Sequence, residues 1–124
     1  PMALRASYVE KSINGNGEQI SLVDENDNRA AIINFNDDWT KNSDGYYYYG
    51  SKENLTKLNK DETSSSFINS VTFNGNISAK LVKKVSADGK TITYTSSCEG
   101  YDNATYVLTI TIDTIQYDQA TNVW

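Results

Sequence analysis

The side chains of this chain that could do chemistry are mostly carboxylates, and they gather in stretches rich in turn-forming residues. Two carboxylates held about 5–10 Å apart over a sugar can act as general acid and base. The chain carries 16 Asp and Glu residues but no His, and His is the commonest general base and transition-metal ligand. The candidates in or near predicted loops are Asp37, Asp38, Asp44, Asp61, Glu62, Glu99 and Asp102. Surface turns carry acidic residues for solubility far more often than for catalysis, so we predict no enzymatic activity.

Residues 24–28 read Asp-Glu-Asn-Asp-Asn and place oxygen ligands at alternate positions, as the start of a calcium loop does. Arg29 stands where an EF-hand needs its glycine, and Phe35 stands where it needs its bidentate glutamate. The segment is therefore not an EF-hand. A looser calcium site on a loop between strands and a solvated acidic turn are the two interpretations that remain. We expect no other cofactor or metal.

Cys98 is the only cysteine in the chain, so no intrachain disulfide can form. Three roles remain open for it: a small buried apolar residue, a free thiol, or a link to a second chain. The serines lack the histidine that a Ser-His-Asp mechanism requires. A Lys–Asn isopeptide crosslink is a further open alternative, because both residue types are abundant and no particular pair stands out.

Length and charge limit the classes of partner. A chain of 124 residues suits one domain spanning residues 1–124, since domains most often have about 100–150 residues. Its unusual start at Pro1 leads us to expect that the natural chain continues before this point. The net charge of −5 leaves no basic face for nucleic acids or anionic membranes. No segment approaches the about 18 consecutive apolar residues of a spanning helix, so we also expect no membrane insertion.

The elements that must position these residues are predicted to be strands. Threonine, tyrosine, isoleucine and valine are frequent, and apolar residues at helical spacing are scarce. Short strands at intervals of roughly 8–12 residues predict an all-β, jelly-roll-like β-sandwich with short loops and at most one or two short helical turns. The predicted strands are Leu4–Lys11, Gln19–Val23, Ala30–Phe35, Trp39–Lys41, Tyr46–Tyr49, Leu55–Leu58, Ser66–Phe73, Ile77–Ser86, Thr91–Ser96 and Tyr106–Gln116.

Two local patterns are specific. The Asp-Gly pair in residues 87–90 predicts a hairpin between the strands on either side. In the last strand the even positions from Tyr106 to Ile112 are apolar, and Ile115 and Tyr117 continue the apolar face on odd numbers. An extra residue would restore the alternation, so we predict a bulge or bend near residues 113–114.

The most unusual stretch joins a tight turn to four consecutive tyrosines. Residues 42–45, Asn-Ser-Asp-Gly, accept left-handed backbone angles, so the strands on either side should pair as a hairpin. Alternation along a strand points Tyr46 and Tyr48 to one face and Tyr47 and Tyr49 to the other. One pair can then pack inward while the other meets solvent or a partner. The predicted structural and assembly motif comprises Trp39, Asp44, Gly45, Tyr46, Tyr47, Tyr48 and Tyr49.

Several motifs occur in an order that resembles a known family. Residues 38–39 (Asp-Trp) precede residues 44–49 (Asp-Gly-Tyr-Tyr-Tyr-Tyr), residues 60–63 (Lys-Asp-Glu-Thr) follow before a strand, and the last strand ends in Ile115-Gln116. This order resembles the exported biofilm matrix proteins of Gram-positive bacteria that the SipW-type signal peptidase processes, a group that includes TasA and camelysin. The resemblance covers nearly the whole chain, although Asp61 replaces the glycine usual in that turn.

The resemblance implies a secreted structural subunit of an extracellular biofilm matrix or cell surface. Such subunits look like jelly rolls that self-associate into fibres, because an N-terminal segment of one copy completes the sheet of the next by donor-strand addition. An unpaired strand edge offers backbone donors and acceptors that an incoming strand satisfies. Some relatives carry a metallo-endopeptidase label, but a chain without histidine has no His-Glu-x-x-His motif.

Two other functions remain open. A carbohydrate-binding or adhesin module of a cell-surface protein is the main alternative, because Trp39 and the tyrosines offer aromatic faces on which sugars can stack. An ordinary stable domain of a larger surface protein is the second.

Overall fold

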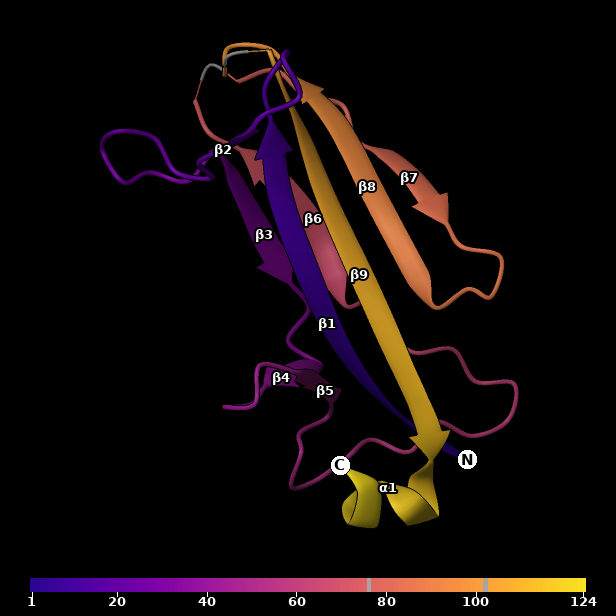
Figure 1. Cartoon of the computed structure of the whole chain (residues 1–124). Coiled ribbons are helices and arrows are strands. Elements are labelled where there is room, and N and C mark those ends of the chain that lie inside the picture. Colours follow the sequence, from indigo (N-terminus) through magenta and orange to yellow (C-terminus); the bar gives the residue numbers. More distant parts are fainter. Residues whose placement is uncertain (76, 102) are drawn as a thin grey trace. The chain divides into compact units, whose positions relative to one another are not determined.

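The computed structural model describes residues 1–75, 77–101 and 103–124. Asp102, one of the carboxylates considered above, lies outside the described residues, as does Asn76. The described chain is mostly β, with one short helix at its end, which confirms the predicted all-β, sandwich-like fold (Figure 1). Its elements are β1 (Met2–Ile13), β2 (Gln19–Ile20), β3 (Ala31–Phe35), β4 (Trp39–Lys41), β5 (Tyr47–Tyr49), β6 (Ile68–Phe73), β7 (Val82–Val85), β8 (Thr91–Cys98), β9 (Ala104–Gln116) and α1 (Tyr117–Val123).

The strands form two sheets. In the larger sheet the order is β4-β5-β1-β9-β8-β7, and β2 pairs with β1 beside this path. The smaller sheet contains only β3 and β6 among the described residues. The first and last strands of the chain, β1 and β9, are therefore neighbours in the centre of the larger sheet. Because the two ends of the chain pair with each other in the centre, the edge strands of that sheet are β4 and β7.

The chain divides into two compact units. Unit 1 comprises residues 1–7, 35–69 and 111–124, and unit 2 comprises residues 8–34 and 70–110. Strands β1 and β9 are each divided between the two units, with some residues in unit 1 and the others in unit 2. The prediction of one domain spanning the chain stays a prediction.

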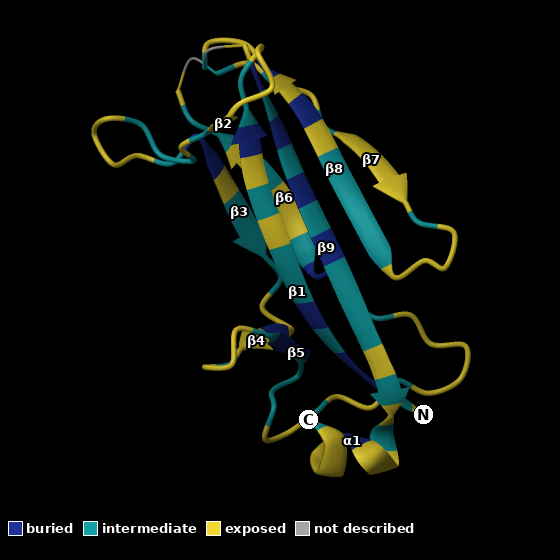
Figure 2. Ribbon diagram, in the orientation of Figure 1, coloured by how far each residue is buried: buried dark blue, intermediate teal, exposed yellow. Residues whose placement is uncertain are grey.

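The core of unit 2 lies along β9, where alternate side chains are buried and the residues between them are half-buried (Figure 2). Leu108 is fully buried, and Tyr106 and Ile110 lie on the same face. The ring of Phe73 from β6 meets the ring of Tyr106 edge-on, with centroids 5.7 Å apart. This contact packs β6 against β9.

A polar cluster closes one side of that core. Arg29 donates two hydrogen bonds to the Glu10 carboxylate, at 2.7 and 2.6 Å, and the Tyr106 hydroxyl donates to Glu10 Oε2 at 2.8 Å. Burial raises the pKa of Tyr106, and its hydrogen bond to Glu10 raises this pKa further. The hydrogen bond with Glu10 also raises the pKa of Arg29. Each charged group of the cluster is hydrogen-bonded to a partner, which offsets the cost of removing the Glu10 carboxylate from water.

Four turns share one construction that the sequence predicts through Asn, Asp and Gly. In each, the backbone N–H of the fourth residue donates to the carbonyl of the first, and the fourth residue has a positive φ: Gly17 (82°), Asp27 (65°), Gly45 (90°) and Gly89 (73°). In the Gly17 and Asp27 turns the first residue also accepts backbone N–H groups through its side chain, as in Asx turns. The Asp-Gly hairpin of β7 and β8 is confirmed by the pairing of Val85 with Ile92.

Several predicted strands are wrong in extent. Leu55–Leu58 is not a strand, because Leu55 bridges Gly50 while Leu58 bridges Met2, so the segment contacts two chain segments without forming a ladder. Of the strand predicted at Ile77–Ser86 the structure keeps only β7. Ser78 nevertheless bridges Glu99 in the same register in which β7 pairs with β8. The segment predicted at Gln19–Val23 keeps only β2, and β1 is longer than Leu4–Lys11 because β2, β5 and β9 pair along it.

Strand β9 runs unbroken to Gln116, where the family resemblance places the end of the last strand. The burial pattern changes phase near the predicted position, because Thr114 and Gln116 are exposed while Ile115 is half-buried. The bulge itself stays a prediction. No helix of the described chain is long and apolar enough to cross a membrane.

Candidate functional site at the tyrosine hairpin

The tyrosine stretch forms the predicted hairpin in unit 1. Trp39 pairs with Tyr49, Thr40 with Tyr48, and Lys41 with Tyr47. Gly45 closes the turn with a φ of 90°, a conformation that favours glycine. Strand β5 also pairs with β1, so the hairpin belongs to the larger sheet.

One face of the hairpin packs in an aromatic cluster around Phe67. The Tyr47 ring stacks on Phe35 with centroids 4.8 Å apart and meets Phe67 edge-on at 5.0 Å. The Trp39 ring lies 5.4 Å from Phe67 and 5.0 Å from Tyr49. The indole N–H of Trp39 donates to a backbone carbonyl at 3.3 Å. Offset and edge-on ring pairs of this kind stabilise by about 0.5–1.5 kcal/mol each beyond their burial.

The opposite face is organised by Arg5. Its guanidinium carbon lies 4.0 Å from the centre of the Tyr46 ring and 4.7 Å from the centre of the Trp124 ring. Arg5 Nε also donates to Asp113 Oδ2 at 3.1 Å. Guanidinium groups bind aromatic faces through charge and dispersion. Arg5 thus joins β1, the tyrosine hairpin, β9 and the residue that follows α1; we call this arrangement the Arg5 clamp.

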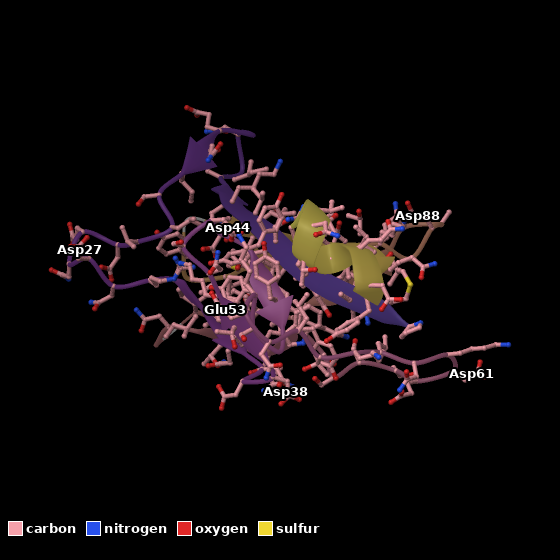
Figure 3. The ribbon with its side chains drawn as sticks, turned by 90° about the horizontal axis from the view of Figure 1, so that it is seen from below. Asp27, Asp38, Asp44, Glu53, Asp61 and Asp88 are labelled. Atoms are coloured by element: carbon pink, nitrogen blue, oxygen red, sulfur yellow. The ribbon has the colours of Figure 1, made fainter. Side chains whose placement is uncertain are left out.

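Asp44 anchors the same face through three contacts. The Tyr48 hydroxyl donates to Asp44 Oδ2 at 2.6 Å, Lys52 Nζ lies 3.4 Å from that oxygen, and the backbone N–H of Tyr46 donates to Oδ1 at 2.9 Å. The hydrogen bond from Tyr48 is the main cause that lowers the pKa of Asp44 to about 2. Burial raises the pKa of Tyr48. Figure 3 labels Asp44 together with Glu53, the neighbour of Lys52.

The predicted division of the tyrosines between two faces is correct, but the predicted division between inside and outside is wrong. Tyr48 is fully buried and Tyr47 is 8% exposed, although they lie on opposite faces. Tyr46 and Tyr49 are half-buried. Both faces are covered because the Phe67 cluster packs on one and the Arg5 clamp on the other.

Other predicted sites lie apart from the hairpin. Asp24 Oδ1 accepts the backbone N–H groups of Asn26 and Asn28 at 2.8 and 2.9 Å, so this carboxylate closes a turn. Across the described residues there is no group of three His, Cys, Asp or Glu side chains that could hold a metal. Cys98 is buried and free, and burial raises the pKa of its thiol.

The sequence identified the tyrosines, Trp39 and Asp44 but missed Arg5, Phe67 and Trp124. These three lie 57 residues or more from one another in the sequence, beyond the range of any strand or turn pattern. The only sequence signal for this part of the site is the residue type of Trp124, because a large aromatic side chain near the end of a chain needs a partner to cover it. The resulting arrangement holds rings and charges in place.

No protein-family model, curated protein or solved structure matches this chain.

Tyr48 should be the most sensitive residue of the hairpin. We expect Tyr48→Ala to lower the free energy of unfolding by about 3–5 kcal/mol, because it removes a fully buried ring. Tyr48→Phe should cost much less, since it removes only the hydroxyl that bonds Asp44. Denaturant unfolding followed by near-ultraviolet circular dichroism measures both, and equal losses for the two variants would contradict this packing.

Asp44 should make stability depend on pH in acid. Its folded-state pKa of about 2 lies below the ordinary value of 3.8, so its contribution is present above about pH 4 and is lost as the pH falls towards 2. We expect Asp44→Asn to be less stable than the unmodified protein at pH 5 and to approach it at pH 2, with Asp61→Asn as the matched control. Unfolding midpoints at both pH values test this, and a gap that stays constant would overturn it.

Proposed function

We propose that this chain is a structural subunit of an extracellular fibre or matrix, in which an extended segment of a neighbouring copy adds to the open edge of β6. The extracellular setting and the fibre follow from the family resemblance. The observation that carries the proposed mode of assembly is the smaller sheet, which contains only β3 and β6 within the described chain. Each of these strands therefore offers one row of backbone donors and acceptors to an incoming strand.

Charge distinguishes these edges from those of the larger sheet. Strands β3 and β6 contain no charged residue. Edge strand β7 carries Lys83 and Lys84. Edge strand β4 carries Lys41, and two aspartates directly precede this strand. Charged side chains, lysine above all, protect natural sheet edges from pairing with other chains. The smaller sheet lacks this protection, which favours it as the edge that accepts a strand.

An uncovered and largely apolar surface in unit 2 favours β6 over β3. Val85 pairs directly with Ile92 and Lys83 with Tyr94, so these side chains share a face, on which Val85, Ile92 and Tyr94 are apolar and Lys83 is charged. Ser96 and Cys98 on the same face are buried. Val85 is nevertheless 48% exposed, and Ile92 and Tyr94 are half-buried. We call Val85, Ile92 and Tyr94 the β7–β8 shelf.

Figure 1 shows β6 behind the space between β1 and β9 and β3 to the left of β1, while no described strand lies behind β7 and β8. Figure 2 accordingly colours β7 as exposed and much of β8 as intermediate. A strand added at the free edge of β6 would extend the smaller sheet across the β7–β8 shelf. It would gain backbone hydrogen bonds on one side and apolar burial of about 25 cal/mol per Å² on its face. The role requires no catalysis.

The carbohydrate-binding alternative was based on stacking of a sugar on Trp39 and the tyrosines, and Trp39 does not support it. Trp39 is 5% exposed and packs against Phe67 and Tyr49, so its ring offers no face to a sugar.

A charge on the β7–β8 shelf should block assembly. We expect Val85→Lys to abolish fibres in electron micrographs, because an added strand would bury the new ammonium. Val82→Lys is the matched control: it makes the same change on the same strand, but Val82 lies on the opposite face and is 63% exposed. Both variants should remain folded by circular dichroism. Fibres that tolerate Val85→Lys, or a chain that forms no fibres at any concentration, would overturn the proposal.

A further inference from the structure

A groove runs along α1 in unit 1. It consists of two hollows of about 330 and 310 Å³ that share Lys52, Glu53 and Thr121. The first is also lined by Trp124 and the second by Tyr117 and Asp118. Because the hollows share their lining, they form one elongated depression between residues 52–55 and the helix, which we call the α1 groove.

One face of α1 supplies the aromatic part of this groove. Tyr117, Thr121 and Trp124 follow one another at helical spacings of four and three residues, which places them on one side. The two rings are about 10 Å apart along the axis by the rise of a helix. Trp124 is held by Arg5 and meets the Tyr48 ring edge-on at 5.9 Å. Lys57 Nζ lies 4.8 Å from the centre of the Tyr117 ring. Both rings are therefore fixed in place, and both are half-buried.

Polar groups stand between these rings. The carboxylates of Glu53 and Asp118 are exposed, and neither forms an ion pair with another described residue. Lys52 and Asn54 add hydrogen-bond donors on the same side. Carboxylates accept from ligand hydroxyls, while ammonium and amide groups donate to them. Fixed aromatic faces with donors and acceptors between them suit a ligand that has apolar C–H faces and many hydroxyls.

Charge narrows the class of that ligand. The carboxylates of Glu53 and Asp118 are balanced by two ammonium groups, Lys52 in the lining and Lys57 against the Tyr117 ring, so the groove carries no net charge that would select a charged ligand. The chain as a whole carries a net charge of −5, which repels an acidic polysaccharide or a nucleic acid. The length of the groove favours several linked sugars over a single one. From these features we infer that the α1 groove binds an uncharged oligosaccharide, a ligand site independent of the fibre-subunit role.

Titration with defined oligosaccharides tests this inference. The probes are the β-1,4-linked tetramers of glucose and of N-acetylglucosamine, with the tetramer of galacturonate as the acidic comparison. We expect saturable binding of at least one neutral tetramer, measured by calorimetry, and no binding of galacturonate. Trp124 fluorescence should change on binding, because Trp39 is already buried.

Two single substitutions locate the site. Glu53→Ala should weaken binding of the neutral tetramer by about tenfold, because it removes a charged hydrogen-bond acceptor. Glu25→Ala is the matched control, since it makes the same change at an exposed residue of unit 2 and should leave binding within about twofold. Circular dichroism checks that both variants are folded. Absence of saturable binding to either neutral tetramer, or equal binding by Glu53→Ala and the unmodified protein, would overturn the inference.

Discussion

The Arg5 clamp is the interaction on which the rest of unit 1 depends. A single guanidinium lies between the rings of Tyr46 and Trp124 and bonds Asp113, so it connects the first strand, the tyrosine hairpin and the last strand. With Arg5 in place, Tyr48 is buried and Trp124 is fixed beside the α1 groove. The clamp also helps to hold β1 between β5 and β9. Both edges of β1 are therefore paired within its own chain, and the strand edges open to a neighbouring copy belong to other strands.

Local chemistry made much of the fold predictable. The Asn42 and Ser86 turns and the alternation of Tyr46 to Tyr49 follow from short-range patterns. The clamp was beyond prediction, because Arg5 and Trp124 are separated by almost the whole chain. The failure at Leu55–Leu58 has a related cause: its two leucines pair with segments that no local pattern identifies.

The two proposals rest on different surfaces and different physics. Strand addition at β6 depends on uncharged backbone edges and on the uncovered Val85 and Ile92 in unit 2. Sugar binding depends on the fixed rings and carboxylates of the α1 groove in unit 1. The rings of the tyrosine hairpin, the most conspicuous feature of the sequence, are largely used for packing, although Tyr48 also lines one hollow of the α1 groove. A subunit with both properties could join copies of itself and hold a neutral polysaccharide in the same matrix.

Residue-resolved backbone hydrogen exchange, compared between monomer and assembled fibre, tests the central claim most directly. We predict that β6 amides directed away from β3 exchange rapidly in the monomer and become strongly protected in the fibre, while exchange at Lys83 and Lys84 of β7 stays unchanged. Protection of all β6 amides in the monomer, or protection that appears at β7 and not at β6 on assembly, would contradict strand addition at this edge.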